Sequence, residues 1–266
     1  MKTSHLLLIS DLHVGSTFSL WPRNHQHTGG EHKLAGYQEW LLDRFNEMVE
    51  GLPRLDAVII NGDLLDGENE KQSGRGCITS DPADQAAAAI VILSALRKKS
   101  RHIFLVRGTP YHEGASHEGL EYVGSELKCE RWGAANRYSD QVLERRWQGH
   151  VINATHHQTT GFIYQLGAAS RTAMFAAIAE ADKGAVRADI IVRSHTHTDG
   201  LGFVNGRWII MLPCWSFTTP YAIRKMEYYR AVATNALGAV LLSDDGNLSV
   251  KPIRYVPPTM EVTNLV

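Results

Sequence analysis

Residues 6–13 read Leu6-Leu-Leu-Ile-Ser-Asp11-Leu-His13, an apolar run that stops at a carboxylate and an imidazole. Four aliphatic residues are too few for a helix and are typical of a strand buried on both faces. Asp11 and His13 then fall at the carboxyl end of that strand, which is the edge of an open α/β sheet where ligands bind. A carboxylate oxygen and an imidazole nitrogen this close together suit a divalent transition metal. The run therefore predicts a buried strand with part of a metal site at its end.

Two further buried strands in the first half, predicted over 56–61 and 102–107, end in the same way. Each is followed at once by a glycine and then by acidic, hydroxyl or imidazole side chains. The two motifs are Gly62-Asp63-Leu-Leu-Asp66 and Gly108-Thr109-Pro-Tyr-His112-Glu113. Glycine permits the close backbone approach that such strand ends need.

Helices are predicted between these strands. An apolar stripe at helical spacing predicts one over 34–50, and Asp81-Pro82, an N-cap followed by proline at the first helical position, begins another over 82–99. A third is expected over 117–127. Because strands alternate with helices, the first half predicts parallel strands joined by right-handed crossovers.

The second half continues with two more strands and then changes character. Strands are predicted over 151–155 and 189–193, ending at His156-His157 and at Ser194-His195-Thr-His197, with a helix-rich stretch over 164–182 between them. Asn205-Gly206 and Asp245-Gly246 are two-residue turn signals, so hairpins are expected afterwards. The predicted strands of these hairpins cover 201–204, 207–212, 236–243 and 247–253. The fold class predicted is α/β, with a parallel first half and a more antiparallel second half in a single domain over 1–266.

Composition excludes several classes of protein. The 266 residues carry a formal net charge of −1, which argues against a broad nucleic-acid-binding surface but leaves a local basic groove open. No run approaches the roughly 20 apolar residues of a membrane span. The three widely spaced cysteines, Cys77, Cys129 and Cys214, are expected to be reduced thiols in a cytoplasmic protein without a signal peptide.

The order and context of these motifs resemble the calcineurin-like metallophosphoesterase superfamily. Its blocks are D-x-H, G-D-x-x-D, G-N-H-[DE], a lone histidine and G-H-x-H, and the resemblance spans residues 6–197. In this sequence the blocks are Asp11-Leu-His13, Gly62-Asp63-Leu-Leu-Asp66, Gly108-Thr109-Pro-Tyr-His112-Glu113, His156, and Ser194-His195-Thr-His197. The variant G-T-P-x-H loop resembles phosphoesterases of phage and prophage sequences. The resemblance implies two sheets in a β-sandwich flanked by helices, with a binuclear metal site at the strand ends.

The resemblance also implies a role for each matched residue. Asp11, His13 and His197 would hold one metal ion, His156 and His195 would hold a second, and Asp63 would bridge the two. His112 would be the catalytic residue that stabilises charge or protonates the leaving oxygen. Thr109, Asp66 and Arg107 are candidates for supporting these ligands or for binding substrate. A bridging ligand must be an anion with two lone-pair directions, which favours the Asp63 carboxylate over any imidazole.

The sequence departs from the family at two positions. Thr109 stands where the family has asparagine, with two extra residues before His112, and Ser194 stands where the family has glycine. A hydroxyl is a weaker ligand than an amide carbonyl, so the second metal site is expected to be weaker or to be completed by His112 or water.

Several assignments stay open from the sequence. His156 is preferred over His157 because it follows the strand directly. Asp66 could support a metal-bound imidazole or cap a turn, and Arg107 and Arg193 could bind phosphate or pair with a carboxylate. Trp215, Phe217 and Tyr221 could line a substrate face or belong to the core. Four other histidines are expected to be solvated: His25, His27, His32 and His117.

The function expected is hydrolysis of phosphate esters with two divalent cations, Mn²⁺, Fe or Zn²⁺. A phosphodiester is the preferred substrate, with nucleotides or nucleic acid as candidates. One alternative is a phosphomonoesterase or phosphoprotein phosphatase on the same scaffold, to be separated by whether the surface near Trp21 and Trp215 forms a pocket or an open groove. Another is a degenerate metal-binding interaction module that has lost activity.

Overall fold

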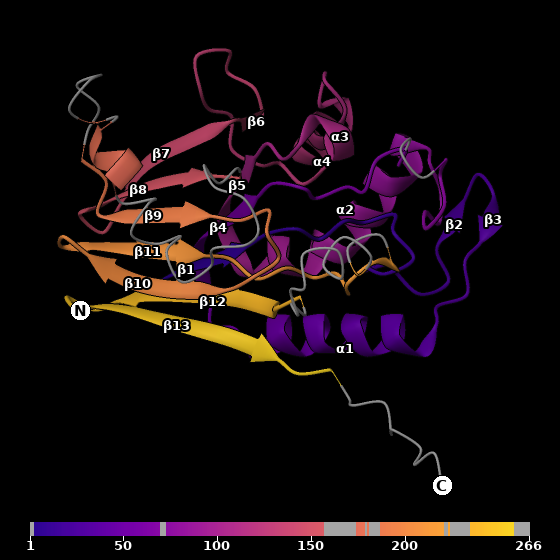
Figure 1. Ribbon diagram of the computed structural model, residues 1–266, viewed down its shortest axis with the longest axis horizontal. Coiled ribbons are helices and arrows are strands. Elements are labelled where there is room, and N and C mark those ends of the chain that lie inside the picture. Colours follow the sequence, from indigo (N-terminus) through magenta and orange to yellow (C-terminus); the bar gives the residue numbers. More distant parts are fainter. Residues whose placement is uncertain are drawn as a thin grey trace, which may run out of the picture.

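The computed structural model describes residues 3–69, 73–156, 174–178, 180, 187–220, 223 and 235–257. Within these residues two large sheets lie next to each other, and helices cover the first of them (Figure 1). A two-stranded ribbon, β2 (Gln26–His27) with β3 (Gly30–Glu31), lies in the polar stretch over residues 14–33. Local sequence pattern does not predict this ribbon, because two-residue strands have no detectable periodicity.

The first sheet has the strand order β13-β12-β1-β4-β5-β6. The strands β1, β4, β5 and β6 pair with one another in parallel, whereas the β1–β12 and β12–β13 pairs are antiparallel. Their bounds are β1 Ser4–Ile9, β4 Leu55–Asn61, β5 Ser100–Val106, β6 Ser139–Asp140, β12 Leu237–Asp244 and β13 Leu248–Tyr255. The predicted parallel first half is confirmed, and its strands end at the same edge.

The second sheet has the strand order β10-β11-β9-β8-β7. The pairs β8–β9 and β9–β11 are parallel, whereas β7–β8 and β10–β11 are antiparallel hairpins. Bounds are β7 Val142–Trp147, β8 His150–Thr155, β9 Ile190–Arg193, β10 Gly200–Val204 and β11 Arg207–Met211. The two expected hairpin turns are confirmed, and the second half is a mixture of parallel and antiparallel pairs.

The helices are α1 (Gly36–Gly51), α2 (Pro82–Lys99), the short α3 (Pro110–Glu113) and α4 (Glu118–Glu126). The start of α2 follows the predicted N-cap, because the Asp81 carboxylate accepts a hydrogen bond from the Ala83 amide at 2.8 Å. The predicted helix-rich stretch over 164–182 lies mostly outside the described residues. Its described part, 174–178 and 180, is helical. None of the helices in the described parts of the chain has the length and apolar character needed to cross a membrane.

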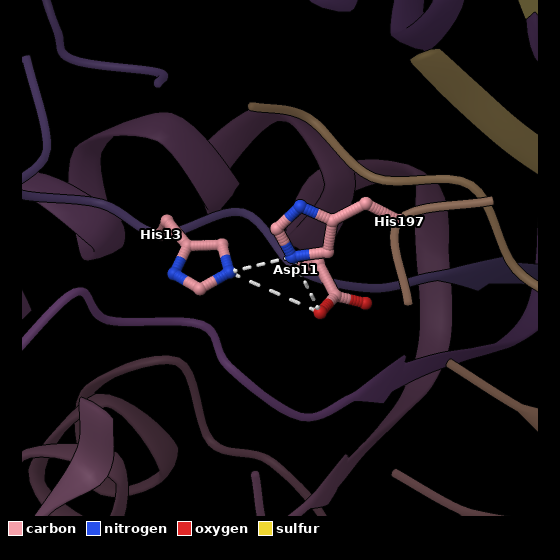
Figure 2. A group of neighbouring side chains, drawn as sticks. All are labelled: Asp11, His13 and His197. Atoms are coloured by element: carbon pink, nitrogen blue, oxygen red, sulfur yellow. Dashed lines mark hydrogen bonds and ion pairs between the residues drawn. The ribbon is translucent and has the colours of Figure 1, made fainter. Parts of the chain in front are cut away.

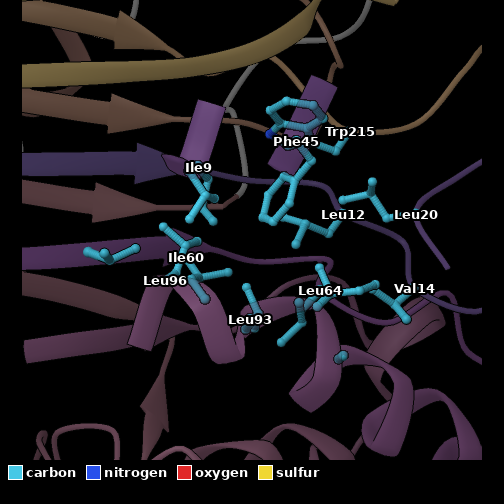
Figure 3. Packing of buried hydrophobic residues seen from close by; sticks show 14 of the residues in the cluster. Ile9, Leu12, Val14, Leu20, Phe45, Ile60, Leu64, Leu93, Leu96 and Trp215 are labelled. Carbon is cyan, nitrogen blue, oxygen red and sulfur yellow. The ribbon is translucent and has the colours of Figure 1, made fainter. Parts of the chain in front are cut away.

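The buried strand β1 shows why the two layers meet where they do. Leu7 and Ile9 face α1 and α2, whereas Leu6 and Leu8 face the second sheet. Figure 3 shows Ile9 and Ile60 of neighbouring strands packed with Phe45 and with residues of α2. Burial on both faces was the expectation for this strand, and it fixes Asp11 and His13 at the centre of the sheet edge.

Candidate metal centre

The six metal ligands that the sequence predicts come together at the carboxyl ends of four strands, β1, β4, β8 and β9. They form two groups whose ligand atoms lie within 4.8 Å of one another. One group is Asp11, His13 and His197; the other is Asp63, His156 and His195. These are the two sets implied by the family resemblance, with Asp63 beside the second set. His157 lies outside the described residues.

In the first group, two imidazole nitrogens and one carboxylate oxygen face a common point (Figure 2). His197 Nε2 lies 3.2 Å from Asp11 Oδ1 and 3.1 Å from His13 Nε2, and His13 Nε2 lies 3.9 Å from Asp11 Oδ1. Asp11 and His13 are buried, whereas the His197 side chain is about one-fifth exposed. The group is therefore open to solvent on the His197 side.

The second group is centred on Asp63. Its Oδ2 atom lies 3.0 Å from His156 Nε2 and 3.8 Å from His195 Nδ1. His156 also lies 3.9 Å from Asp11 Oδ1, which makes the two groups neighbours. Asp63 and His156 are buried, but 44% of the His195 side chain is exposed, so the second group is open to solvent at His195.

Each aspartate turns one oxygen to hydrogen-bond donors and the other to the imidazoles. Asp11 Oδ2 lies 2.6 Å from Ser10 Oγ, and Asp63 Oδ1 accepts from the Thr109 amide at 2.6 Å and from Thr109 Oγ1 at 3.0 Å. The opposite atoms, Asp11 Oδ1 and Asp63 Oδ2, are buried and accept no aligned hydrogen bond within the described residues. Such an oxygen costs about 1–3 kcal/mol. A cation among the mixed His and Asp donors would offset that cost, so the residues fit a divalent metal.

The backbone at the ligands is strained. Asp11, His13, Asp63, His195 and His197 all have positive φ angles, between 44° and 77°. The left-handed region costs an L-residue on the order of 1 kcal/mol, and such strain is kept mainly at functional sites. Five strained residues in one cluster therefore support a functional role independently of the side-chain chemistry.

Glycines next to the ligands allow the loops to approach closely. A Cβ atom on Gly62, whose φ is +86°, would lie 2.5 Å from the His156 ring, and one on Gly108 would lie 2.1 Å from the Asp63 amide nitrogen. The Glu113 carboxylate joins the same two loops, since it accepts from the Leu64 amide at 3.0 Å and from the Gly108 amide at 2.6 Å. The Gly-Asp and Gly-Thr motifs are therefore a steric requirement of this site.

The backbone carbonyl of Asn61 contacts one member of the second group and the residues that precede Asp11 and His195. His156 Nδ1 donates to it at 2.7 Å, and the hydroxyls of Ser10 and Ser194 each lie 2.8 Å from it. A carbonyl can only accept, so this bond fixes the proton of His156 on Nδ1 and leaves Nε2 for a metal. Sequence reasoning missed Ser10 and Asn61; their only signal was a polar residue directly before a ligand motif. Ser194, noted only as a departure from glycine, supplies one of the hydroxyls.

Asp66 and His112 lie behind His13. Asp66 Oδ1 is 3.3 Å from His13 Nδ1, and His112 Nδ1 donates to the Asp66 carbonyl at 2.7 Å, with the His112 and His13 rings 4.5 Å apart. His13, Asp66 and His112 can also be grouped as three metal-ligating side chains. Since His13 Nδ1 faces a carboxylate, Asp66 orients the imidazole whose other nitrogen joins the first group.

The remaining candidates lie further from the two groups. Arg107 contacts Ser139 Oγ at 3.1 Å and Glu121 at 4.0 Å, which is the pairing alternative left open from the sequence. Trp21 and Trp215 are completely buried, which is the core alternative left open for Trp215. His117 was expected to be solvated, but it is buried next to Glu113, with 3.4 Å between Nδ1 and Oε2. Tyr221 lies outside the described residues.

Opposite charges in the cluster shift its pKa values. Burial alone would raise the pKa of Asp11, but His156 and His197 outweigh it and lower the pKa to about 2. Burial likewise acts to raise the pKa of Asp63, yet His156 holds it well below its usual range. Burial lowers the pKa of His156, but Asp63 and Asp11 outweigh this and raise it to about 10. Without metal, His156 is therefore an imidazolium at neutral pH, with a second proton on Nε2.

We expect metal binding to release this proton, because a metal ligand must be a neutral imidazole. The apparent affinity for Mn²⁺ should then rise with pH below the raised His156 pKa of about 10, by about tenfold per unit for each proton displaced. Calorimetric titration at pH 6 to 9, in buffers of different ionisation enthalpy, measures both quantities. The variant His102→Ala is a suitable control, since His102 is exposed and paired with Glu130. An affinity that is constant across this pH range would contradict the prediction.

Comparisons with known proteins gave matches among solved structures. No protein-family model matches the sequence, and no curated protein matches it. A single mutant of Vps29 from Entamoeba histolytica is 15% identical, over 95% of this chain and 99% of that chain, with a TM-score of 0.43. A novel archaeal phosphodiesterase is 11% identical over 94% and 99%, with a TM-score of 0.47. A predicted phosphoesterase from Streptococcus pneumoniae TIGR4 is 13% identical over 96% and 91%, with a TM-score of 0.41. At these identities and TM-scores, the similarity implies nothing about the activity of this chain.

Proposed function

We propose that this chain is a calcineurin-like metallophosphoesterase that hydrolyses phosphodiesters, with nucleotides or nucleic acid as candidate substrates. The observation that carries the proposal is the pair of adjoining Asp/His groups, each with one buried carboxylate oxygen turned toward imidazole nitrogens. The G-T-P-x-H loop that resembles phage-type phosphoesterases supports the preference for diesters.

Each residue has a role in the proposed mechanism. Asp11, His13 and His197 would hold one cation, His156 and His195 the other, and Asp63 would lie between them. Two bound cations supply charge neutralisation at the phosphoryl oxygens and a water that ionises at neutral pH. His112 Nδ1 donates to the Asp66 carbonyl, so Nε2 is the ring nitrogen that would hold, in the imidazolium form, the proton passed to the leaving oxygen. Solvent reaches His195 and, in part, His197, so an ester can approach the two groups at these side chains.

Metal content and hydrolysis together test this proposal. Protein purified without chelator should contain about two metal ions per chain, and added Mn²⁺ should support hydrolysis of bis(p-nitrophenyl) phosphate. Faster hydrolysis of p-nitrophenyl phosphate than of the diester, across several metals, would overturn the diester preference and favour the phosphomonoesterase or phosphoprotein phosphatase. About one ion per chain, with no turnover of either ester, would favour the degenerate interaction module.

The degenerate module is a real alternative because of Thr109. Both of its donors are directed to Asp63 Oδ1, so its hydroxyl is engaged with the carboxylate. Under our proposal Thr109 positions Asp63 and the wild type is active. Under the alternative the wild type is nearly inactive, and Thr109→Asn, which restores the family residue, should raise turnover from that baseline.

We expect Thr109→Val to lower kcat/KM by about fivefold to tenfold, because it removes one hydrogen bond to a charged carboxylate and keeps the amide donor. Thr109→Ser keeps the hydroxyl and should retain most of the activity. The measurement is steady-state hydrolysis of the diester with Mn²⁺ titrated into both variants. Equal activity of the valine and serine variants would show that the hydroxyl does not position Asp63.

A further inference from the structure

Three aromatic side chains from separate parts of the chain meet next to the candidate metal centre. We call Phe18, Tyr37 and Phe217 the aromatic rim. The rings of Phe18 and Tyr37 are nearly parallel, at 16° with centroids 6.3 Å apart, and Phe217 meets Tyr37 edge-on at 5.7 Å. Trp40 packs behind Phe217 at 6.0 Å. The rim thus joins the start of α1 to two loops that follow strand ends.

Short hydrogen bonds tie the rim to the first metal group. The Phe217 amide donates to the Phe18 carbonyl at 2.9 Å, and the neighbouring Trp215 amide donates to the Asp11 carbonyl at 3.0 Å. Asn235 Nδ2 lies 2.8 Å from the Ser216 carbonyl and 3.1 Å from His197 Nδ1. The Phe217 amide is therefore separated from the His197 ring by a single side chain and one peptide unit, a path of no more than about 10 Å.

The rim is accessible, in contrast to the buried Trp215. Tyr37 is 42% exposed and Phe18 and Phe217 are half-buried, whereas Trp215 is completely buried against Phe45. His197 and His195 are the exposed members of the two groups, and His197 is the one that faces the rim through Asn235. Solvent therefore reaches both the rim and the His197 ring, and Asn235 contacts His197 on one side and the residue before Phe217 on the other.

The chemistry of the rim favours contact with the flat face of a ligand's aromatic ring. The Tyr37 hydroxyl donates to the Thr17 carbonyl at 3.0 Å, so its proton is used within the protein and its ring remains for contact. Phenylalanine has no polar atom, so the rim offers π-faces in place of a pattern of donors and acceptors. Stacking of this kind accepts any nucleobase, because every base has a π-face.

We infer that the aromatic rim stacks against the nucleobase of a nucleotide ester whose phosphate lies at the metal centre, a specificity that no part of the metal cluster provides. The inference rests on the proposed function and deepens it by naming the substrate class. Because one sugar separates base from phosphate in a nucleotide, a base on the rim and a phosphate at His197 and Asp11 are compatible with the short path between them.

Two diesters with the same leaving group test the inference. Thymidine 5′-(p-nitrophenyl) phosphate and methyl p-nitrophenyl phosphate both release p-nitrophenolate, so they differ only in the nucleoside. We expect kcat/KM to be about tenfold higher for the nucleoside ester, within the range that base stacking supplies. The double variant Tyr37→Ala/Phe217→Ala should lose this preference and keep the rate on the methyl ester. Tyr37→Phe, which keeps the ring, should keep the preference.

A matched control and a second readout make the outcomes distinct. Tyr122, 50% exposed on α4, gives the control variant Tyr122→Ala. Saturation-transfer NMR of thymidine 5′-monophosphate on metal-free protein should show contact to the thymine protons in the wild type and lose it in the double variant. If kcat/KM is equal for both esters, and saturation transfer to thymine is the same in the wild type and the double variant, the inference about the rim is wrong and the proposed function is unaffected. If neither ester is hydrolysed, the proposed function is wrong. The NMR signal alone then tests whether the base contacts the rim.

Discussion

Replacing Asp63 with asparagine is expected to remove the second cation and to lower hydrolysis on the order of 10³-fold, the several kcal/mol that a cation pair contributes. The orientation of the new amide explains the size of the effect. Thr109 directs two donors to Asp63 Oδ1, so the amide oxygen must take that position and the NH₂ group must take the place of Oδ2. That group would then face His156 Nε2, where the carboxylate oxygen now lies 3.0 Å away. A donor in this place repels a cation.

Elemental analysis of the Asp63→Asn protein, alongside diester hydrolysis, measures both effects. Asp43→Asn is the matched control, because Asp43 loses the same charge at an exposed ion pair with Arg23. The control should keep its metal and its activity, since exposed pairs contribute little. An Asp63→Asn protein that still holds two ions per chain would contradict the assignment of Asp63 as the ligand between the groups.

Gly62→Ala is expected to have the largest effect on folding among single methyl additions at the site, about 2–4 kcal/mol of lost stability. Two separate terms add. The φ of +86° strains any L-residue, and the new Cβ would lie 2.5 Å from the His156 ring, which is itself held by the Asn61 carbonyl. Because the ring cannot move without breaking that bond, the 62–66 loop must shift and carry Asp63 with it.

Chemical denaturation of the Gly62→Ala protein gives the free energy of unfolding, and metal titration of the same sample reports on Asp63. Gly51→Ala is the control, since its Cβ would meet nothing within 4 Å and its φ is in the ordinary range. The control should be neutral or slightly more stable. Equal free energies of unfolding for the two variants would mean that the close approach at Gly62 is not a constraint.

Much of the fold could be predicted from local pattern. The run at residues 6–9 gave β1, buried on both faces as expected, and Asp81-Pro82 gave the start of α2. These features depend on composition over a few neighbouring residues, which is what a sequence displays directly. The convergence of the Asp and His motifs followed from parallel strand order, because parallel strands end at one edge.

Other features depend on contacts between distant segments and had no local signal. The direction of Thr109 toward Asp63 requires the 62–66 and 108–113 loops to touch, which Gly108 and Glu113 bring about. His117 was predicted to be solvated and is buried, because α3 and α4 enclose it beside Glu113. The burial of Trp215 likewise follows from its contact with Phe45 of α1, 170 positions earlier in the numbering.

The single carbonyl of Asn61 has a consequence for how the two sites fill. Its three neighbours are Ser10, which precedes Asp11 of one group, His156 of the other, and Ser194, which precedes His195. Ordering any one of these loops orders the oxygen that the others share. We therefore expect a cation bound by either group to lower the conformational entropy that the next cation must still remove, which would be positive cooperativity without a change of shape. Titrated with Mn²⁺, the chain should take up both ions in one steep transition, and damage to one group should weaken the other.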